Sequence, residues 1–399
     1  MKTKINHILP VLLLTAASGL TTVSCNDFLD KTPDNRTELN TDQKIAKLLV
    51  SAYPDVSPNE LFELYSDNSD DSGPTYGYYQ LSEKECYNWE DTKEEYQDTP
   101  NSLWGGYYGA ISAANMALKA IEEKGNPASL NPQRGEALVC RAYCHFMLAT
   151  IFCNAYDTHA SESLGIPYME DVETTVSPRY ERSTLEEVYR KVERDLLEGV
   201  ELISDDGYSV PKYHFTRKAA YAFAARFYLY YMKPDFSNCD RVIDFATRVL
   251  GTNPADLLRN WEALGNLSVN GNVQADAYIA SSNEANLLIS STVSNWGAIG
   301  SDYLIGPRYF HNQTLATSET CLSSGLWGSS DYFYLKPFST NGFVASILRK
   351  SGLYEGTYLY YMPVLFSTDE TLLCRAEADL NEAIRLNPED VENYKSRAQ

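Results

Sequence analysis

Apolar residues recur every three or four positions in five stretches of the chain, and this spacing predicts amphipathic helices. The five stretches cover residues 103–123, 132–152, 184–203, 216–231 and 238–250. Gly125, Asn126 and Pro127 interrupt the pattern after the first stretch. Shorter patterns of the same kind lie at residues 44–53 and 372–386. The chain is therefore expected to be mainly α-helical.

Two of these stretches, residues 216–231 and 238–250, differ in side-chain size and suggest a helix pair. The first is rich in alanine, which lets two helices approach closely, and Asn253 and Pro254 follow the second. Together they match a helix-turn-helix repeat of roughly 34 residues. A similar helical pattern with small residues occurs at 372–386 (LLCRAEADLNEAIRL). Because such units cannot bury their apolar faces alone, three or four tetratricopeptide-like pairs are expected to stack into one scaffold.

Two long regions lack helical periodicity. Residues 54–100 are acidic and aromatic, and residues 251–362 are rich in Gly, Ser, Asn and Tyr. Long loops inside a domain are uncommon and are usually functional. We predict a single domain over residues 41–399. Its helical scaffold is expected at about 41–53, 103–250 and 365–399, and its loop-rich insertions at about 54–102 and 251–362.

The first 24 residues have the composition of an export signal. Lys2 and Lys4 precede an apolar run over residues 8–20, and small residues follow up to Ser24. The run is shorter than the roughly 20 apolar residues that a spanning helix needs. Residues 1–24 are therefore predicted to be a signal peptide.

Cys25 follows these small residues directly, as in a lipoprotein signal whose cysteine is acylated after cleavage. We predict that Cys25 carries acyl chains that hold the protein at a membrane, with residues 25–40 as a tether. The alternative is an ordinary secretory peptide in which Cys25 is a chance thiol. Thr22 stands where a leucine would strengthen the motif.

Composition narrows the function. The formal net charge is −21, from 33 basic and 54 acidic residues, and this disfavours nucleic-acid binding. The 30 tyrosines, 14 phenylalanines and 5 tryptophans suit a chain that presents contact surface. Cys140 and Cys144 lie one helical turn apart in an apolar stretch, where buried thiols are expected. No CxxC pair occurs and the five histidines are scattered, so we expect no zinc site and no cofactor.

No catalytic pattern is present. The chain has no GxSxG, HExxH, P-loop or GxGxxG motif, so we do not expect an enzyme. Residues 67–73 (DNSDDSG) alternate oxygen-bearing side chains, but they lack the glycine and closing glutamate of an EF-hand loop. We interpret them as a solvated acidic loop.

Three tryptophans in the irregular regions have polar neighbours, which suits sugar recognition. An aromatic ring covers the apolar face of a sugar, while polar side chains bind its hydroxyl groups. The alternative for each ring is a half-buried loop anchor. The candidate ligand-binding residues are Trp89, Asn88, Trp296, Trp327, Asp331 and Tyr332.

Other conspicuous residues are assigned to the scaffold. Trp104 is in helical register with Tyr107 and Ile111, so it is expected to pack rather than bind. Arg141 and Arg226 lie within apolar helices, where a buried guanidinium needs a carboxylate partner. Each is expected to form an ion pair within the scaffold.

Several stretches resemble the SusD/RagB family of outer-membrane nutrient-binding lipoproteins. The start at Cys25 (CNDFLD) looks like that family's segment after the lipobox. Ile166-Pro167-Tyr168 is similar to a family "P-L/Y" stretch. The other similar stretches are residues 104–115 (WGGYYGAISAAN), 135–154 (GEALVCRAYCHFMLATIFCN), 217–231 (RKAAYAFAARFYLYY) and 375–382. Residues 251–362 match no part of the family pattern.

The resemblance implies a tetratricopeptide-like scaffold that carries an irregular ligand-binding half. It also implies a lipid-anchored protein on the outer surface of the outer membrane, with a SusC-like TonB-dependent transporter as its partner. The ligand would be an oligosaccharide or, in one branch, a peptide. A protein-interaction scaffold without a nutrient ligand is the other alternative. The chain is short for the family and ends thirteen residues after Leu386, where members usually continue.

Overall fold

The computed structural model describes residues 39–292 and 308–310, with short gaps. The gaps are residues 68, 72, 75–79, 96, 174, 176, 177, 207, 261, 262, 264–266 and 268–272. The predicted signal peptide, Cys25 and the predicted helical segment at 365–399 lie outside the described residues.

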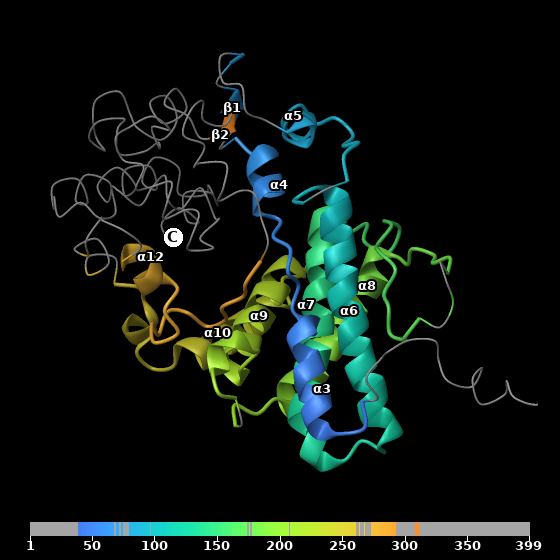
Figure 1. The fold of residues 1–399 in the computed structure, drawn as a ribbon, viewed down its shortest axis with the longest axis vertical. Helices are drawn as coiled ribbons and strands as arrows, with labels where there is room; N and C mark the ends of the chain where they lie inside the picture. The colour runs from blue at the N-terminus through green and yellow to red at the C-terminus, as the bar shows by residue number, and fades with distance from the viewer. Residues whose placement is uncertain are drawn as a thin grey trace, which may run out of the picture. The chain divides into compact units, whose positions relative to one another are not determined.

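Within this part the chain is mainly helical, as predicted (Figure 1). The α-helices are α3 (Asp42–Leu49), α4 (Asn59–Leu64), α5 (Leu81–Tyr87), α6 (Pro100–Glu123), α7 (Asn131–Phe152), α8 (Leu185–Leu202), α9 (Arg217–Tyr230), α10 (Cys239–Leu250) and α12 (Val273–Tyr278). Short 3-10 turns are η1 (Val50–Ala52), η2 (Ala128–Leu130), η3 (Pro211–Tyr213) and η4 (Pro254–Leu257). The five long periodic stretches and the one at 44–53 are therefore helical within a few residues of their predicted bounds, and the stretch at 372–386 lies outside the described residues.

Threonine side chains fix the starts of the long helices. The hydroxyl of Thr99 accepts the backbone N–H of Ser102 at the start of α6, at 3.4 Å. Thr184 and Thr216 cap α8 and α9 in the same way. Each cap satisfies a backbone N–H that the helix itself leaves without a partner.

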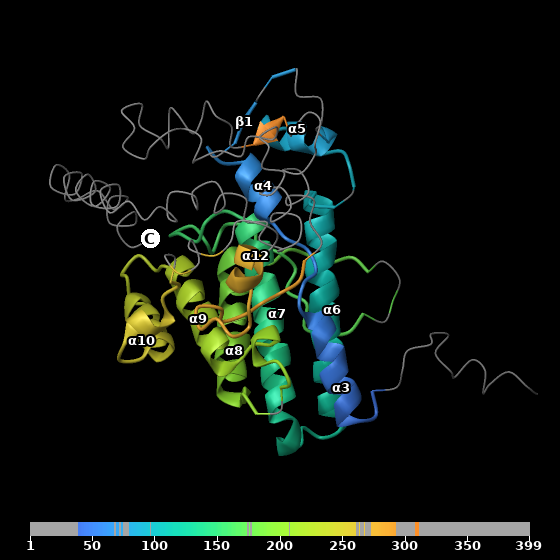
Figure 2. The same ribbon diagram turned by 60° about the vertical axis from the view of Figure 1, so that its left-hand side comes forward.

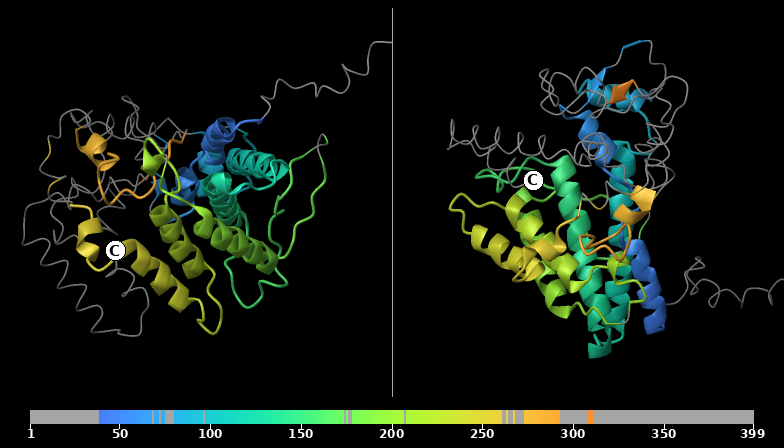
Figure 3. Two further views of the ribbon diagram at one scale, coloured as in Figure 1. Left: turned by 90° about the horizontal axis from the view of Figure 1, so that it is seen from below. Right: turned by 90° about the vertical axis from the view of Figure 1, so that its left-hand side faces the viewer.

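The helices lie side by side in the order α6, α7, α8, α9 and α10, with α3 against α6 (Figures 2 and 3). Glycines bring α7 and α8 into backbone contact. A Cβ atom on Gly135 would lie 2.8 Å from the carbonyl oxygen of Gly199, and the reverse distance is also 2.8 Å. Any side chain at either position would therefore push the two helices apart.

The predicted pair at 216–231 and 238–250 is confirmed as the helix pair α9 and α10. Ala220 and Ala224 are fully buried in α9, and Phe227 lies beside them. The rings of Tyr228 and Phe245 join the two helices, with centroids 5.8 Å apart and planes within 7° of parallel. Small residues thus let the helices approach, and aromatic rings fill the space between them.

Residues 54–100 contain more order than predicted. They carry the short helices α4 and α5 and the strand β1 (Asp70–Asp71), which pairs antiparallel with β2 (Tyr309–Phe310). Arg308 donates two hydrogen bonds to the Asp71 carboxylate, at 2.6 and 2.7 Å. These bonds lower the pKa of Asp71. The interpretation of residues 67–73 as a solvated acidic loop is therefore wrong at Asp71, which forms an ion pair. The sequence could not show this pair, because Arg308 lies 237 positions away.

The two arginines assigned to scaffold ion pairs behave differently. Arg141 is buried and pairs with Asp195, as expected. Arg226 is exposed, and its guanidinium lies over the rings of Phe146 and Tyr230, 5.9 Å from each centroid. The expected buried ion pair of Arg226 is therefore wrong, because its position on α9 turns the side chain toward aromatic surface and solvent.

Cys140 and Cys144 are buried free thiols, as expected. No helix in the described residues has the length and the apolar character to cross a membrane.

Candidate functional site: an exposed indole and an aromatic cavity

Trp89 lies directly after helix α5, and its indole is 75% exposed. The neighbouring ring is that of Tyr65, the C-cap residue of α4, with centroids 4.8 Å apart and planes inclined at 53°. Two aromatic rings from two helix ends therefore stand side by side, one of them open to solvent. Of the three predicted tryptophan platforms, this is the one within the described residues.

The backbone at Trp89 has a conformation that is rare for any residue except glycine. Its φ angle is +57°. The N–H of Trp89 donates to the carbonyl of Cys86, and the N–H of Glu90 donates to that of Glu85, at 2.9 and 2.8 Å. This is the Schellman pattern of hydrogen bonds, which normally places a glycine at the left-handed position. The motif fixes the direction in which the indole leaves the backbone.

Asn88, the predicted polar neighbour of Trp89, has a local role. Its side-chain amide donates to the carbonyl oxygen of Lys84 at 2.8 Å, inside the same helix end. Asn88 itself is exposed. Trp296, Trp327, Asp331 and Tyr332 lie outside the described residues. Their assignment to ligand binding stays a prediction.

Helices α4 and α5, which precede Tyr65 and Trp89, also carry buried carboxylates. Glu83 and Glu60 are 1% and 3% exposed. Neither carboxylate oxygen of Glu83, and only one of Glu60, has a hydrogen-bond partner among the described residues. Burial raises the pKa of Glu83 to about 8. The backbone at Gln80 acts in the opposite direction and lowers this pKa, although it makes no hydrogen bond with Glu83. The carboxylates of Asp98 and Glu94 raise the pKa of Glu83 further.

Glu60 behaves in the same way as Glu83. Burial raises its pKa well above the ordinary value, and the nearby carboxylates of Asp98 and Glu83 raise it further. Glu83 is therefore mostly neutral near pH 7, and the pKa of Glu60 is shifted in the same direction.

An aromatic cavity of about 200 Å³ lies between α6 and the segment that follows α7. Trp104 and Tyr108 line it from α6, with ring centroids 4.9 Å apart. Pro167, Met169 and Tyr180 line it from the opposite side. Trp104 also packs against Phe152 at 5.1 Å, so it has the packing role expected of it and lines a cavity as well.

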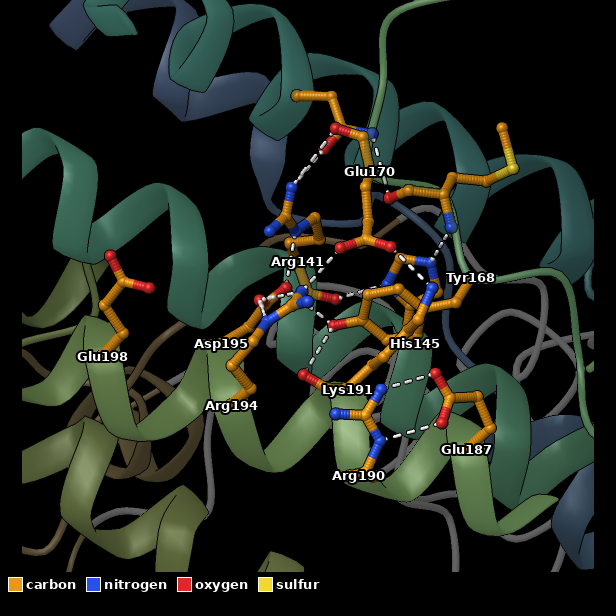
Figure 4. A network of polar contacts seen from close by, with 12 residues as sticks. Arg141, His145, Tyr168, Glu170, Glu187, Arg190, Lys191, Arg194, Asp195 and Glu198 are labelled. Carbon is orange, nitrogen blue, oxygen red and sulfur yellow. Dashed lines mark hydrogen bonds and ion pairs between the residues drawn. The ribbon is translucent and has the colours of Figure 1, made fainter. Parts of the chain in front are cut away.

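The segment at 167–171 is clamped to α7 by buried polar contacts (Figure 4). The N–H of Met169 donates to Nε2 of His145 at 2.9 Å, and Nδ1 of His145 lies 2.9 Å from the carbonyl oxygen of Arg141. The rings of His145 and Tyr168 stack at 3.8 Å. Burial lowers the pKa of His145 to about 3, so the ring is neutral and donates from Nδ1.

Ion pairs continue from this clamp along α8 (Figure 4). Asp195 is 1% exposed and accepts hydrogen bonds from Arg141 at 2.6 Å and from Tyr168 at 2.7 Å. Burial alone would raise the pKa of Asp195, but these bonds and the Arg141 charge lower it below its ordinary value. Arg194 adds a further bond at 2.6 Å. The charges line a second, more polar hollow of about 500 Å³.

The two hollows share Asn115 and Asp171. Sequence reasoning did not find the aromatic cavity, because its walls come from α6 and from a segment more than fifty positions later. Nothing in the sequence distinguished Tyr65 from the other aromatic residues of 54–100. No group of His, Cys, Asp and Glu side chains in the described part could hold a metal ion.

Comparison with known proteins gives the family. A SusD-like family model, described as "Starch-binding associating with outer membrane", matches residues 27–229, just over half of the chain. No curated protein matches the chain.

Three solved structures that match are distant from this chain in sequence. A SusD superfamily protein from Bacteroides vulgatus is 22% identical, with 72% of this chain and 63% of that chain covered and a TM-score of 0.49. A putative sugar binding protein from the same species is 21% identical, with coverages of 66% and 59% and a TM-score of 0.48. A SusD superfamily protein from Bacteroides thetaiotaomicron is 20% identical, with coverages of 56% and 48% and a TM-score of 0.44.

The chain thus spans between about half and two thirds of the length of these structures. The family assignment depends on the match over residues 27–229, which contains α3 to α8, most of α9 and both aromatic sites described above. The chain belongs to the SusD-like family of starch-binding proteins associated with the outer membrane.

Proposed function

We propose that this protein binds an oligosaccharide or polysaccharide at the Trp89 platform, without altering it chemically. The observation that carries the proposal is the exposed indole of Trp89, held by the Schellman motif next to Tyr65. A backbone conformation that disfavours a large side chain is retained here with the largest side chain of all. Strain of this kind is kept where a side chain must point in one direction for function.

A flat, fixed ring suits a sugar. It covers the apolar C–H face of the sugar at little cost in side-chain entropy, because the direction of the ring is already set. Asn88 is exposed and next to Trp89 in the sequence, and its amide oxygen would offer an acceptor for a sugar hydroxyl. The starch-binding description of the family supports a glycan as the ligand.

The proposal includes the cellular setting. Acylation of Cys25 would anchor the protein in the outer membrane, facing the exterior, and the bound glycan would pass to a TonB-dependent transporter. The predicted signal peptide at 1–24 and the outer-membrane description of the family support this setting. A peptide ligand, or a scaffold that binds only a partner protein, is the alternative.

Calorimetry on the full chain in detergent tests the proposal. Soluble starch, maltoheptaose, other polysaccharides and a peptide mixture would be titrated against the protein and against Trp89→Ala. We expect one glycan to bind, and Trp89→Ala to weaken that binding about tenfold through lost ring contact. Tyr213→Ala is the matched control, since Tyr213 is an exposed aromatic residue of η3, 53% exposed. Unchanged affinity in Trp89→Ala, or binding of peptides alone, would contradict the proposal.

A further inference from the structure

The aromatic cavity between α6 and the segment at 167–180 is a site separate from the Trp89 platform. Neither Trp89 nor Tyr65 lines it. Its walls are Trp104, Tyr108 and Ile111 on one side and Met169 and Tyr180 on the other. A hollow walled by aromatic and aliphatic side chains is suited to binding an apolar stem.

Most hydrogen-bond donors in the lining of this cavity already have partners within the protein. The side-chain amide of Asn115 donates to the carbonyl oxygens of Met169 and Asp171, at 3.1 and 3.4 Å. Its oxygen accepts from Arg141 at 3.0 Å. The hydroxyl of Tyr108 donates to the carbonyl oxygen of Pro167 at 2.7 Å.

Tyr180, the other tyrosine that lines the cavity, also donates its hydroxyl hydrogen to a group of the protein. The hydroxyl of Tyr180 donates to Glu173 at 2.7 Å. The donors of Asn115, Tyr108 and Tyr180 are thus all directed at the protein itself. The polar side chains left to meet a ligand are then the hydroxyl of Ser112 and the carboxylates of Asp171 and Glu173, so negatively charged acceptors dominate the lining.

Two acidic side chains give the cavity its charge. Asp171 and Glu173 both line it, and both are exposed. Among the described residues none forms an ion pair with Asp171. Arg182, whose charge acts on Tyr108, donates to the carbonyl oxygens of Leu164 and Gly165 and is not part of the lining. The cavity therefore joins apolar walls to a negative rim.

We propose that this cavity binds an arginine or lysine side chain presented by a partner polypeptide. The aliphatic stem of such a side chain lies against Ile111 and Met169, as long cationic side chains do on apolar surface. The cationic end stacks on the aromatic faces of Trp104 and Tyr180 and reaches the carboxylates of Asp171 and Glu173. A basic side chain is the occupant that uses the apolar walls, the rings and the rim together.

Ligand-detected NMR on the full chain in detergent tests the proposal. The probes are acetyl-Gly-Arg-Gly-amide and the same peptide with citrulline, which keeps the shape and loses the charge. We expect millimolar binding of the arginine peptide, with saturation transfer strongest at its methylene protons, and at least about fivefold weaker binding of the citrulline peptide. Asp171→Asn with Glu173→Gln should reduce the arginine preference, because both are exposed and the change removes only charge.

Two further measurements make the test specific. Tyr180→Ser removes a ring that is 44% exposed, and it should weaken binding without unfolding the protein. Glu123→Gln changes an exposed acid at the far end of α6 and should have no effect.

Equal binding of the two peptides, or a full arginine preference in the doubly neutralised variant, would overturn the proposal. Displacement of the arginine peptide by maltoheptaose would assign the cavity to sugar and overturn it as well. Glycan binding at Trp89 is measured independently, so either proposal can fail alone.

Discussion

The α4–α5 segment and the α6–α9 scaffold both bury carboxylates, but they satisfy them differently. In the scaffold, Glu136 is 2% exposed and accepts hydrogen bonds from Tyr53 and Tyr208, at 2.7 and 2.9 Å. Asp195 is paired with Arg141. In the α4–α5 segment, Glu83 is as deeply buried and neither of its oxygens has a hydrogen-bond partner among the described residues.

The same contrast appears where helices end. Helix α6 closes with a Schellman motif whose left-handed residue is Gly125, with φ +81°. Helix α5 closes with the same motif, but its left-handed residue is Trp89. The segment that carries the exposed indole thus departs twice from the rules that favour stability, while the scaffold and its α9–α10 pair depart at Gln133, whose buried Oε1 has no partner among the described residues, and at Phe236, with φ +56°. Departures of this kind concentrate at functional sites.

The largest expected effect on stability concerns the scaffold, where the buried carboxylates have hydrogen-bond partners. Arg141→Met should lower the free energy of unfolding by about 3–5 kcal/mol, because it leaves Asp195 buried without its main charge partner. Chemical denaturation followed by circular dichroism measures this loss. Arg190→Met is the control: Arg190 pairs with Glu187 on the exposed face of α8 at 2.6 Å, and such a pair contributes less than about 1 kcal/mol. Similar losses in the two variants would show that burial of the pair makes no difference.

The next largest effect concerns the α4–α5 segment, where the buried carboxylate of Glu83 has no hydrogen-bond partner among the described residues. The pKa of Glu83 is about 8 in the folded chain and ordinary in the unfolded chain, so the folded state binds its proton more tightly. Stability of the α4–α5 segment is therefore complete at low pH and falls as pH rises from about 4.5 to about 8. One such proton gives a slope of at most about 1.4 kcal/mol per pH unit, and we expect about 2–4 kcal/mol over this window.

Hydrogen exchange of the α5 amides at pH 5 and pH 8 measures this dependence. Glu83→Gln has no proton to lose, and it should remove most of the difference between the two pH values. Glu85→Gln is the comparison, because Glu85 is also buried but already accepts the N–H of Lys93 at 3.0 Å. Equal protection factors of the α5 amides at both pH values in the unaltered chain, after correction for the intrinsic exchange rates, would contradict the assignment of a neutral Glu83.

The scaffold was predictable from the sequence, and the reason is local. The periodic stretches, their threonine caps and Gly125 all lie within one helix of the feature they determine, so α6, α7 and α8 appeared at the predicted places. Helices α4 and α5 are six and seven residues long, too short to show a period. The ion pair of Asp71 with Arg308 and the two walls of the aromatic cavity depend on contacts between distant positions, which no local pattern shows.

The platform was only half predictable for the same reason. Trp89 could be chosen because an indole stands among polar residues in an irregular region. Its partner Tyr65 depends on how α4 meets α5. The left-handed backbone had no sequence mark either, since the residue that usually reveals it is glycine.

The smallest expected effect separates stability from binding at this position. Trp89→Gly relieves the left-handed strain and gives the Schellman motif its usual residue, which should stabilise the α5 end by about 1 kcal/mol. The lost ring contact with Tyr65 offsets part of this gain. Glycan affinity should fall as far as in Trp89→Ala, since both variants remove the indole. Thermal unfolding and calorimetry on the same samples measure the two quantities. If Trp89→Gly is less stable than the unaltered chain, the contact of the indole with Tyr65 outweighs the backbone strain, and the indole serves the fold rather than the ligand.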